Sequence, residues 1–211
     1  MTPRPYDTEA DRLENLWAGT FGDAYLDRNI SAGDLREGFW DTFLSEFPAP
    51  RVLEVGCNAG ANLRWIVPRC EEVWGVDISA RALERLREAV PGAHGVKGSA
   101  RSLPFPDASF DLVFVAGVLI HQSEASVSKV IDELVRVSRR HVLAIEYAAS
   151  QTEEVPYRGE RGALFKRDYR VLFKNLHPQL ELLKEGALDA SGGWDDVAWW
   201  LFRKPDVGNT Q

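Results

Sequence analysis

Residues 51–60, RVLEVGCNAG, and residues 73–77, VWGVD, decide the fold class of this chain. The first stretch is an apolar run followed by a glycine-bearing turn, and the second is an apolar run that ends in Asp77. A strand, a tight turn, a helix and a second strand ending in an acid form half of a dinucleotide-type site. Asp77 lies roughly 20 residues beyond the turn, where a carboxylate can bind both hydroxyls of a ribose. The sequence therefore predicts an α/β fold with a ligand at this turn.

The charge at the turn indicates what kind of ligand it suits. Glu54 stands directly before the glycines, and a carboxylate there repels a pyrophosphate and attracts a cation. Gly56 and Gly60 let the backbone approach a ligand closely, and Asn58 is the residue other than glycine that best tolerates a left-handed conformation. The pattern favours a cationic ligand over NAD. A tight turn without a ligand is the alternative for the turn taken by itself.

Composition and charge set further limits. The 211 residues are 45% hydrophobic and 27% charged, as in an ordinary soluble domain, and the length fits one α/β domain. A net charge of −7 argues against nonspecific binding to nucleic acid. No apolar run reaches the roughly 18 residues of a membrane span, and residues 1–17 lack a signal core. We therefore expect a cytoplasmic protein with no nucleic-acid or membrane partner. Cys57 and Cys70 lack zinc-ligand spacing, so we expect no metal.

Strand and helix patterns alternate along the chain and predict a doubly wound sheet. Strands are expected over residues 52–55, 73–76, 95–97, 110–118, 141–147, 180–187 and 198–202, and the apolar run over 110–118 is typical of a buried parallel strand. Helical spacing of apolar residues predicts helices over residues 8–18, 33–46, 61–67, 79–90, 126–137 and 166–176. A glycine-rich and aromatic stretch separates the first two helices, and residues 150–162 read as a polar loop.

Two motifs carry a family resemblance. The pattern Glu-x-Gly-x-x-x-Gly starting at Glu54, and residues 97–121, KGSARSLPFPDASFDLVFVAGVLIH, resemble motif I and the motif II/III region of class I S-adenosylmethionine (SAM) dependent methyltransferases. That region commonly reads GDAxxLPFPDxSFDxVxxxxVLxH. Ser99 replaces the family's adenine-contacting Asp, and residues 138–141, SRRH, replace the usual Pro-Gly-Gly turn. SAM carries an ammonium and a sulfonium but no phosphate, which agrees with the acid at the turn.

A narrower resemblance covers nearly the whole chain. Residues 17–29, WAGTFGDAYLDRN, residues 146–169, EYAASQTEEVPYRGERGALFKRDY, and the tryptophan-rich terminal strand are similar to the methyltransferases associated with pseudaminic-acid biosynthesis. The name of that family reflects genomic company and says little about a substrate. The resemblance implies a Rossmann-like seven-stranded sheet with an antiparallel final hairpin and helices on both faces. We expect one domain in three parts: an N-terminal helical lid over residues 1–48, a SAM-binding core over 49–149, and an acceptor-binding insert with the C-terminal hairpin over 150–211.

The resemblance also implies which residues hold the cofactor, SAM. Gly56 and Gly60 should lie against its methionine part, Asp77 on its ribose and Ser99 beside its adenine. Arg28 should pair with its carboxylate, in a stretch that acts as a mobile lid; a surface helix is the alternative for that stretch. The expected cofactor-binding residues are Tyr25, Arg28, Glu54, Gly56, Asn58, Gly60, Asp77, Ile78, Ser99, Ala100, Ala116 and Gly117.

The acceptor site is expected at the ends of the two strands that follow. His121 ends one of them, as a general base or as a hydrogen-bonding residue without proton transfer. Tyr147 ends the next, either lining the pocket or packing. Residues 156–174 form a basic segment in this acidic chain, and its arginines suit an anionic group of the acceptor. A solvated helix face is the alternative for this segment. The expected acceptor-binding residues are His121, Tyr147, Tyr157, Arg158, Lys166 and Arg167.

The function that these residues predict is SAM-dependent methyl transfer to an oxygen or nitrogen of a small anionic metabolite, by a monomer or homodimer. A sugar acid, a nucleotide-linked sugar or another carboxylate would fit. One alternative is an NAD(P)-dependent oxidoreductase, which the missing GxGxxG and Tyr-x-x-x-Lys patterns disfavour. A second alternative is a noncatalytic SAM-binding partner of another enzyme.

Overall fold

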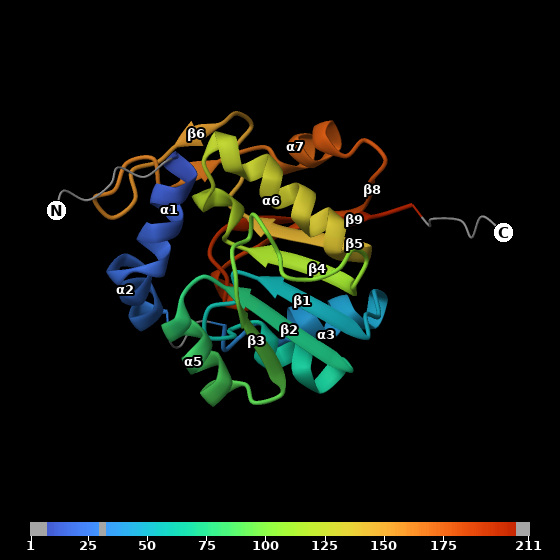
Figure 1. Ribbon diagram of the computed structural model, residues 1–211. Helices are drawn as coiled ribbons and strands as arrows, with labels where there is room; N and C mark the ends of the chain where they lie inside the picture. The colour runs from blue at the N-terminus through green and yellow to red at the C-terminus, as the bar shows by residue number, and fades with distance from the viewer. Residues whose placement is uncertain (1–7, 30–32, 206–211) are drawn as a thin grey trace.

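Seven strands form one mixed sheet in the order β3-β2-β1-β4-β5-β9-β8 (Figure 1). The computed structural model describes residues 8–29 and 33–205, so residues 1–7 and 30–32 of the expected N-terminal segment and residues 206–211 lie outside the described part. The strands are β1 Arg51–Val55, β2 Glu72–Asp77, β3 Ala93–Lys97, β4 Phe110–Ala116, β5 Ser138–Glu146, β8 Glu181–Leu188 and β9 Val197–Arg203. The helices are α1 Glu9–Ala18, α2 Thr20–Arg28, α3 Glu37–Glu46, α4 Leu63–Ile66, α5 Ala80–Ala89, α6 Glu124–Val137 and α7 Tyr169–Leu176, with the short 3-10 turns η1 Val67–Arg69, η2 Leu119–His121 and η3 Ala190–Gly192.

The sheet has the topology that the sequence predicts. Strands β3, β2, β1, β4 and β5 pair in parallel, and β9 runs antiparallel to both β5 and β8. β4, FDLVFVA, and residues 142–145 of β5, VLAI, are mostly apolar because helices cover both faces of the sheet there. All seven expected strands are confirmed. Since the five parallel strands point the same way, their carboxyl ends meet at one edge of the sheet.

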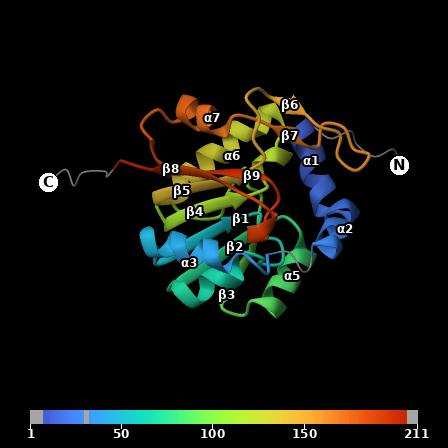
Figure 2. The same ribbon diagram turned by 180° about the vertical axis from the view of Figure 1, so that it is seen from behind.

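Helices cover both faces of the sheet (Figures 1 and 2), and an apolar core lies on each face. On one face α6 and α7 contribute side chains such as Ile131 and Phe173. On the other face α3, α4 and α5 contribute side chains such as Trp40. Trp199 and Trp200 belong to different cores, because neighbouring residues of a strand point to opposite faces of the sheet.

Two segments near the carboxyl edge differ from the sequence expectation. The stretch between the first two expected helices forms α2, and residues 150–162, expected as a loop, contain β6 Glu153–Glu154, which pairs with β7 Phe165–Lys166. A Cβ at Gly22 would lie 1.9 Å from the Trp17 carbonyl oxygen, so α1 and α2 pack together only because this residue is glycine. In Figures 1 and 2, α1, α2 and the β6–β7 segment lie at the same end of the sheet. Within the described ranges, no helix is long and apolar enough to cross a membrane.

Candidate functional site

A cavity of about 510 Å³ lies at the carboxyl edge of β1, β2, β4 and β5. The ends of these strands form its floor, while α1, α2, the segment after β6 and the loop before β9 supply the remaining walls. Ligands of open α/β sheets bind at this edge, and the volume is typical of a small-molecule site. No group of three His, Cys, Asp or Glu side chains within residues 8–29 and 33–205 is placed to hold a metal ion.

The turn after β1 contains three residues in the left-handed conformation, which glycine and asparagine tolerate best. Gly56, Asn58 and Gly60 have φ values of 77°, 48° and 83°. Gly56 and Asn58 line the cavity, whereas a Cβ at Gly60 would lie 2.5 Å from the Leu86 side chain of α5. Gly60 therefore serves the packing of the turn against α5 and does not line the cavity.

Asp77 lies at the end of β2 and joins the turn to the next helix. Its Oδ2 accepts the backbone N–H of Asn58 at 2.8 Å, and its Oδ1 accepts that of Ser79 at 2.8 Å. Burial raises the pKa of Asp77, and these backbone hydrogen bonds oppose that effect. Each carboxylate oxygen can still accept a further hydrogen bond. Asp77 lines the cavity, as expected for a residue that binds a ribose.

Glu54 is 2% exposed, and only one of its two carboxylate oxygens has a hydrogen-bond partner among the described residues. Its Oε1 accepts the Asn62 amide at 2.6 Å, but its Oε2 has no hydrogen-bond partner among the described residues. Burial raises the pKa of Glu54 to about 8, and Asn62 and Arg36 oppose that rise. An unpaired buried carboxylate is costly unless a donor or a cation approaches it. Glu54 lines the cavity, so a ligand can reach it there.

Arg36 is a cavity residue that sequence reasoning missed. Its Nε donates to the Gly193 carbonyl at 2.9 Å, its Nη1 donates to Asn62 Oδ1 at 3.0 Å, and its guanidinium lies 3.9 Å from the ring centroid of Trp194. Burial lowers the pKa of Arg36, and Glu54 partly restores it. Arg28, the arginine expected to bind a carboxylate, is exposed at the end of α2 and does not line the cavity.

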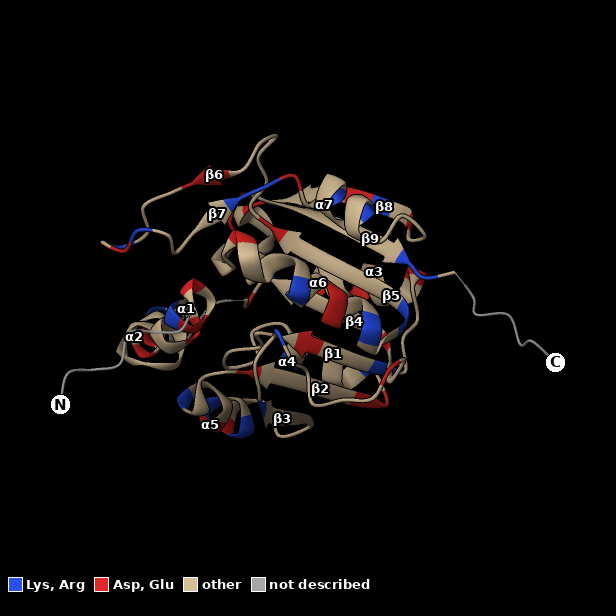
Figure 3. Ribbon diagram, turned by 45° about the horizontal axis from the view of Figure 1, so that its top comes forward, with Lys and Arg blue, Asp and Glu red and all other residues tan. Residues whose placement is uncertain are grey.

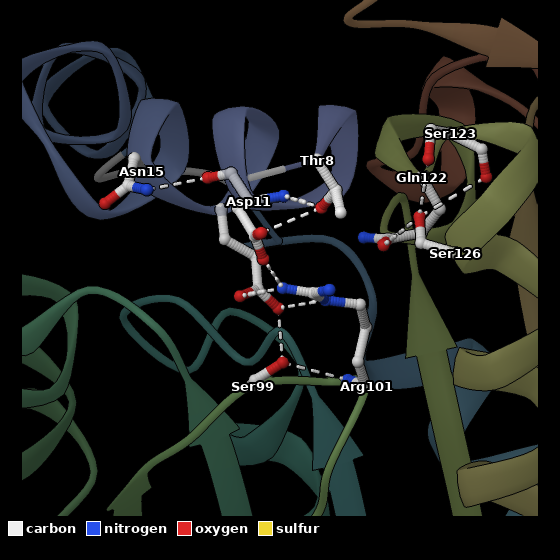
Figure 4. A network of polar contacts seen from close by, with 9 residues as sticks. Thr8, Asp11, Asn15, Ser99, Arg101, Gln122, Ser123 and Ser126 are labelled. Atoms are coloured by element: carbon white, nitrogen blue, oxygen red, sulfur yellow. Dashed lines mark hydrogen bonds and ion pairs between the residues drawn. The ribbon is translucent and has the colours of Figure 1, made fainter. Parts of the chain in front are cut away.

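Ser99 and Arg101 contact α1 instead of lining the cavity (Figure 4). The Ser99 hydroxyl donates to the Glu14 carboxylate. Arg101 donates to both oxygens of Glu14, at 2.8 and 2.6 Å, and to Asp11 at 2.8 Å. The Arg101 hydrogen bonds lower the pKa of Glu14. The turn that was expected to border an adenine therefore fastens α1 over the site. Of its residues, Gly98 and Ala100, on either side of Ser99, line the cavity.

His121 presents a free ring nitrogen to the other half of the cavity. Its Nδ1 lies 2.6 Å from the Ala163 carbonyl, which can only accept, so Nδ1 carries the proton and Nε2 keeps its lone pair. Burial lowers the pKa of His121 to about 4. The rings of Trp17 and Tyr157 lie with centroids 4.3 and 5.4 Å from the imidazole. The neutral imidazole is thus enclosed by aromatic side chains.

Glu146, the last residue of β5, fixes the turn that carries His121 through hydrogen bonds to its backbone. This buried carboxylate accepts the backbone N–H groups of residues 118, 119 and 120, at 2.9, 2.8 and 3.3 Å. Burial raises the pKa of Glu146 to about 7. Because three N–H groups converge on one side chain, the position of the imidazole is fixed by the strand beneath it.

The basic residues of segment 156–174 do not all face the cavity. Figure 3 shows Lys and Arg in the loop after β6 and at β7. Arg158 lines the cavity rim, whereas Lys166 is half-buried outside it. Arg167 is 3% exposed and donates to the carbonyls of Leu119 and Gln122 at 3.3 and 2.9 Å. Arg167 therefore braces the His121 turn and does not face a ligand. Outside the cavity, Arg170 pairs with Glu185 at 3.6 Å.

Three tyrosines and one aspartate converge at the far end of the cavity. The Tyr147 hydroxyl donates to the Asp195 carboxylate, and both residues line the cavity. Burial raises the pKa of Tyr25 to about 12, and nearby Tyr157 and Asp195 add to this rise. Asp195 lies in the loop before β9 and has no motif around it in the sequence, so only the tertiary structure reveals it.

Most expected site residues meet at this one cavity. Those that line it are Tyr25, Glu54, Gly56, Asn58, Asp77, Ile78, Ala100, Ala116, Gly117, His121, Tyr147, Tyr157 and Arg158. Those that do not are Arg28, Gly60, Ser99, Lys166 and Arg167. Polar and aromatic lining residues that the sequence did not predict include Glu14, Trp17, Arg36, Asn62, Trp194 and Asp195.

Comparison with known proteins agrees with this geometry. Residues 53–145 match the family model described as a methyltransferase domain. An uncharacterized methyltransferase from Synechocystis is 33% identical over 90 residues, which cover 43% of this chain and 42% of that protein. The 27-O-demethylrifamycin SV methyltransferase of Amycolatopsis mediterranei is 28% identical over 130 residues, covering 56% of this chain and 48% of that enzyme. The chain thus spans less than half the length of these relatives.

A solved structure extends the likeness to nearly the whole chain. The 1,6-didemethyltoxoflavin-N1-methyltransferase of Burkholderia thailandensis, solved with 1,6-didemethyltoxoflavin and S-adenosylhomocysteine bound, superposes with a TM-score of 0.74 at 13% identity. The match covers 94% of this chain and 92% of that one. The expected class I methyltransferase fold is therefore confirmed, and residues 53–145 are the part that matches the methyltransferase-domain family model.

Proposed function

We propose that this chain, with its class I methyltransferase fold, transfers the methyl group of SAM to an oxygen or nitrogen of a small acceptor. The observation that carries the proposal is the unpaired Oε2 of Glu54, buried in a cavity that also exposes Arg36 and Asp77. A carboxylate, a guanidinium and a second carboxylate match the ammonium, the carboxylate and the ribose hydroxyls of one SAM molecule. The match of residues 53–145 to a methyltransferase domain supports the same cofactor.

The residues that would hold SAM can be assigned from these partners. Glu54 takes the ammonium, Arg36 takes the carboxylate and Asp77 takes the ribose hydroxyls. SAM supplies the methyl group as an electrophile when it is bound. Arg36 replaces Arg28 in this assignment because Arg28 is exposed outside the cavity.

The other half of the cavity is suited to the acceptor. His121 Nε2 accepts the proton that the acceptor loses as the new bond to the methyl carbon forms. A pKa of about 4 keeps this imidazole neutral and able to accept at physiological pH. Trp17 and Tyr157 cover the imidazole and exclude water. Holding two reactants in a dry, fixed geometry can lower a barrier by about 7–11 kcal/mol.

We further propose that the acceptor is a small metabolite with an anionic group. Arg158 supports this, because it places a guanidinium at the rim of the acceptor half. Lys166 and Arg167 are no longer part of the proposal, since neither lines the cavity. A sugar acid, a nucleotide-linked sugar or another carboxylate remains the proposed class. The resemblance to the methyltransferases associated with pseudaminic-acid biosynthesis is compatible with a sugar acid and stays a proposal.

Calorimetry with SAM and with NAD tests the cofactor. We expect SAM to bind and NAD not to bind, and Asp77→Asn to weaken SAM by about 10-fold or more while the far-UV circular dichroism is unchanged. The conservative Asn keeps a hydrogen-bonding side chain at the turn. Binding of NAD but not SAM would contradict the proposal.

Extract of the native host, incubated with methyl-labelled SAM and the protein, tests the reaction and identifies the acceptor by mass spectrometry of the labelled product. A labelled anionic small molecule is the expected product. SAM binding without any labelled product would favour a noncatalytic partner protein.

A further inference from the structure

The cavity contains a second group of polar side chains, Tyr147 and Asp195, to which the proposed reaction assigns no role. Tyr147 follows β5 directly, and Asp195 lies two residues before β9. β5 and β9 are antiparallel neighbours, with Glu146 opposite Ala198, so their facing ends bring the phenol and the carboxylate together. The Tyr147 hydroxyl donates to Asp195 Oδ2, and both side chains line the cavity.

This pair offers only hydrogen-bond acceptors to a ligand. Tyr147 has one hydroxyl proton, and that proton is already committed to Asp195. Burial and the Asp195 carboxylate both raise the pKa of Tyr147, so the phenol keeps its proton. In the described part of the chain, Asp195 Oδ1 has no hydrogen-bond donor. What remains for a ligand is the second lone pair of the phenol oxygen and the free carboxylate oxygen, and both require a donor.

The position of the pair along the sheet assigns it to the acceptor half. Asp77 ends β2, Glu54 precedes the turn after β1, Gly117 follows β4 and Tyr147 follows β5. Neighbouring strands lie about 4.8 Å apart, so Tyr147 stands roughly 14 Å along the edge from the ribose-binding acid. Arg36 and Glu54 already match the charged end of the cofactor. Burial lowers the pKa of Arg36, and Asp195 and Tyr147 lie close enough to Arg36 to oppose that effect, so the pair borders this charged end of the cofactor and faces the acceptor beside it.

We propose that Tyr147 and Asp195 bind a hydroxyl or amino group of the methyl acceptor, held as a hydrogen-bond donor. This inference rests on the proposed function and narrows its substrate class. The acceptor carries an O–H or N–H group for this pair in addition to the anionic group at Arg158, as hydroxy acids and amino acids do. An ether or a second carboxylate at the same place is rejected, because its lone pairs would face those of Asp195 without a proton between them.

Three variants separate this role from cofactor binding. Asp195→Asn keeps the size of the side chain but removes its charge and adds a donor, and Tyr147→Phe removes only the hydroxyl. Asp196→Asn is the matched control, since Asp196 is exposed, is the next residue and does not line this cavity. We expect all three variants to bind SAM within about twofold of wild type by calorimetry. A loss of SAM affinity of tenfold or more in Asp195→Asn alone would overturn the inference, because the pair would then belong to the cofactor half.

A matched pair of probes tests the preference for a donor. 4-Hydroxybenzoate and 4-methoxybenzoate both carry a carboxylate for Arg158, and the methyl group of the second removes the donor at the other end. A preference caused by the bulk of that methyl group would persist in Asp195→Asn, whereas one caused by the donor would not. Their affinities are measured on protein saturated with S-adenosylhomocysteine, by the ¹⁵N–¹H signals of the Trp17 and Trp194 indoles, since both residues line the cavity. We expect wild type and Asp196→Asn to prefer the hydroxy compound by about tenfold, and Asp195→Asn to lose that preference.

The possible outcomes distinguish a failure of the proposed function from a failure of this inference. If wild type binds neither SAM nor S-adenosylhomocysteine, the proposed function is wrong. If the cofactor binds but the two probes bind equally, or the hydroxy compound does not bind, or the preference persists in Asp195→Asn, only this inference is overturned.

Discussion

Replacing Glu54 by Gln should stabilise the protein without cofactor and at the same time weaken cofactor binding. Glu54 is buried, its Oε2 has no partner among the described residues, and burial raises its pKa from an ordinary 4.5 to about 8. Gln has nearly the same shape and can still accept the Asn62 amide through its carbonyl oxygen. The substitution therefore removes the cost of ionising a buried carboxyl and little else.

The expected gain in the free energy of unfolding follows from the pKa of Glu54 in the unfolded chain and in the folded protein. A group whose pKa is higher in the folded state holds its proton there while the unfolded chain has lost it, so wild type loses stability as pH rises from about 4.5 to 8. At 1.36 kcal/mol for each pKa unit, the full difference corresponds to ~5 kcal/mol. Water that enters the cavity beside the ion reduces this cost. We expect Glu54→Gln to gain about 2–4 kcal/mol over wild type between pH 5 and pH 8.

Urea unfolding followed by tryptophan fluorescence at pH 5, 6, 7 and 8 measures this gain. Glu84→Gln is the control, because Glu84 is an exposed carboxyl on α5. Stability curves of Glu54→Gln and wild type that stay parallel across this range would refute the reasoning, since a buried carboxyl that titrates near 8 cannot leave the pH dependence unchanged.

The same carboxyl should release a proton when SAM binds. With a pKa of about 8, Glu54 is about nine-tenths protonated at pH 7, and an ammonium placed against it favours the ionised form. Calorimetry in phosphate and in Tris, which differ in ionisation enthalpy, should therefore detect close to one proton released for each SAM bound by wild type. Glu54→Gln should release none from this site and bind SAM about 10-fold or more weakly.

The remaining predictions concern an arginine, the contact between α1 and the adenine-side turn, and the base. Arg36→Gln should weaken SAM binding by about 10–100-fold in calorimetry, because it removes a charged partner of the carboxylate, whereas Arg28→Gln should leave it unchanged; the opposite result would restore the sequence-based assignment. Arg101→Gln should speed hydrogen exchange in α1 and raise the KM for SAM, because Arg101 fastens α1 through Glu14, whereas Arg85→Gln, which breaks an exposed pair within α5, should do neither. His121→Asn should lower kcat by about 100-fold, and, since a pKa of about 4 leaves His121 neutral, the wild-type kcat should show no loss from this group between pH 9 and pH 6; an equal kcat in the variant would make His121 a positioning residue only.

The sequence by itself determined the sheet, the turn and the acid that follows it. Glu54, Gly56 and Asp77 lie within 24 residues of one another, in a strand, turn, helix and strand whose geometry is local. Short-range geometry leaves few ways to arrange such a unit, so the placement of these residues at one cavity was predictable. Apolar runs likewise predicted central strands such as β1 and β4, because strands buried on both faces are apolar along most of their length.

Only the tertiary structure decided which charged side chains face the cavity. Arg36 is held there by a carbonyl 157 residues away, Ser99 is drawn off by Glu14 at a separation of 85 residues, and Arg167 is buried by a carbonyl 48 residues away. An arginine at the cavity and an arginine bracing a turn are the same letter in the sequence. Their roles differ because hydrogen-bond partners come from distant segments, and those segments meet only when the α1–α2 pair and the loop before β9 pack against the edge of the sheet.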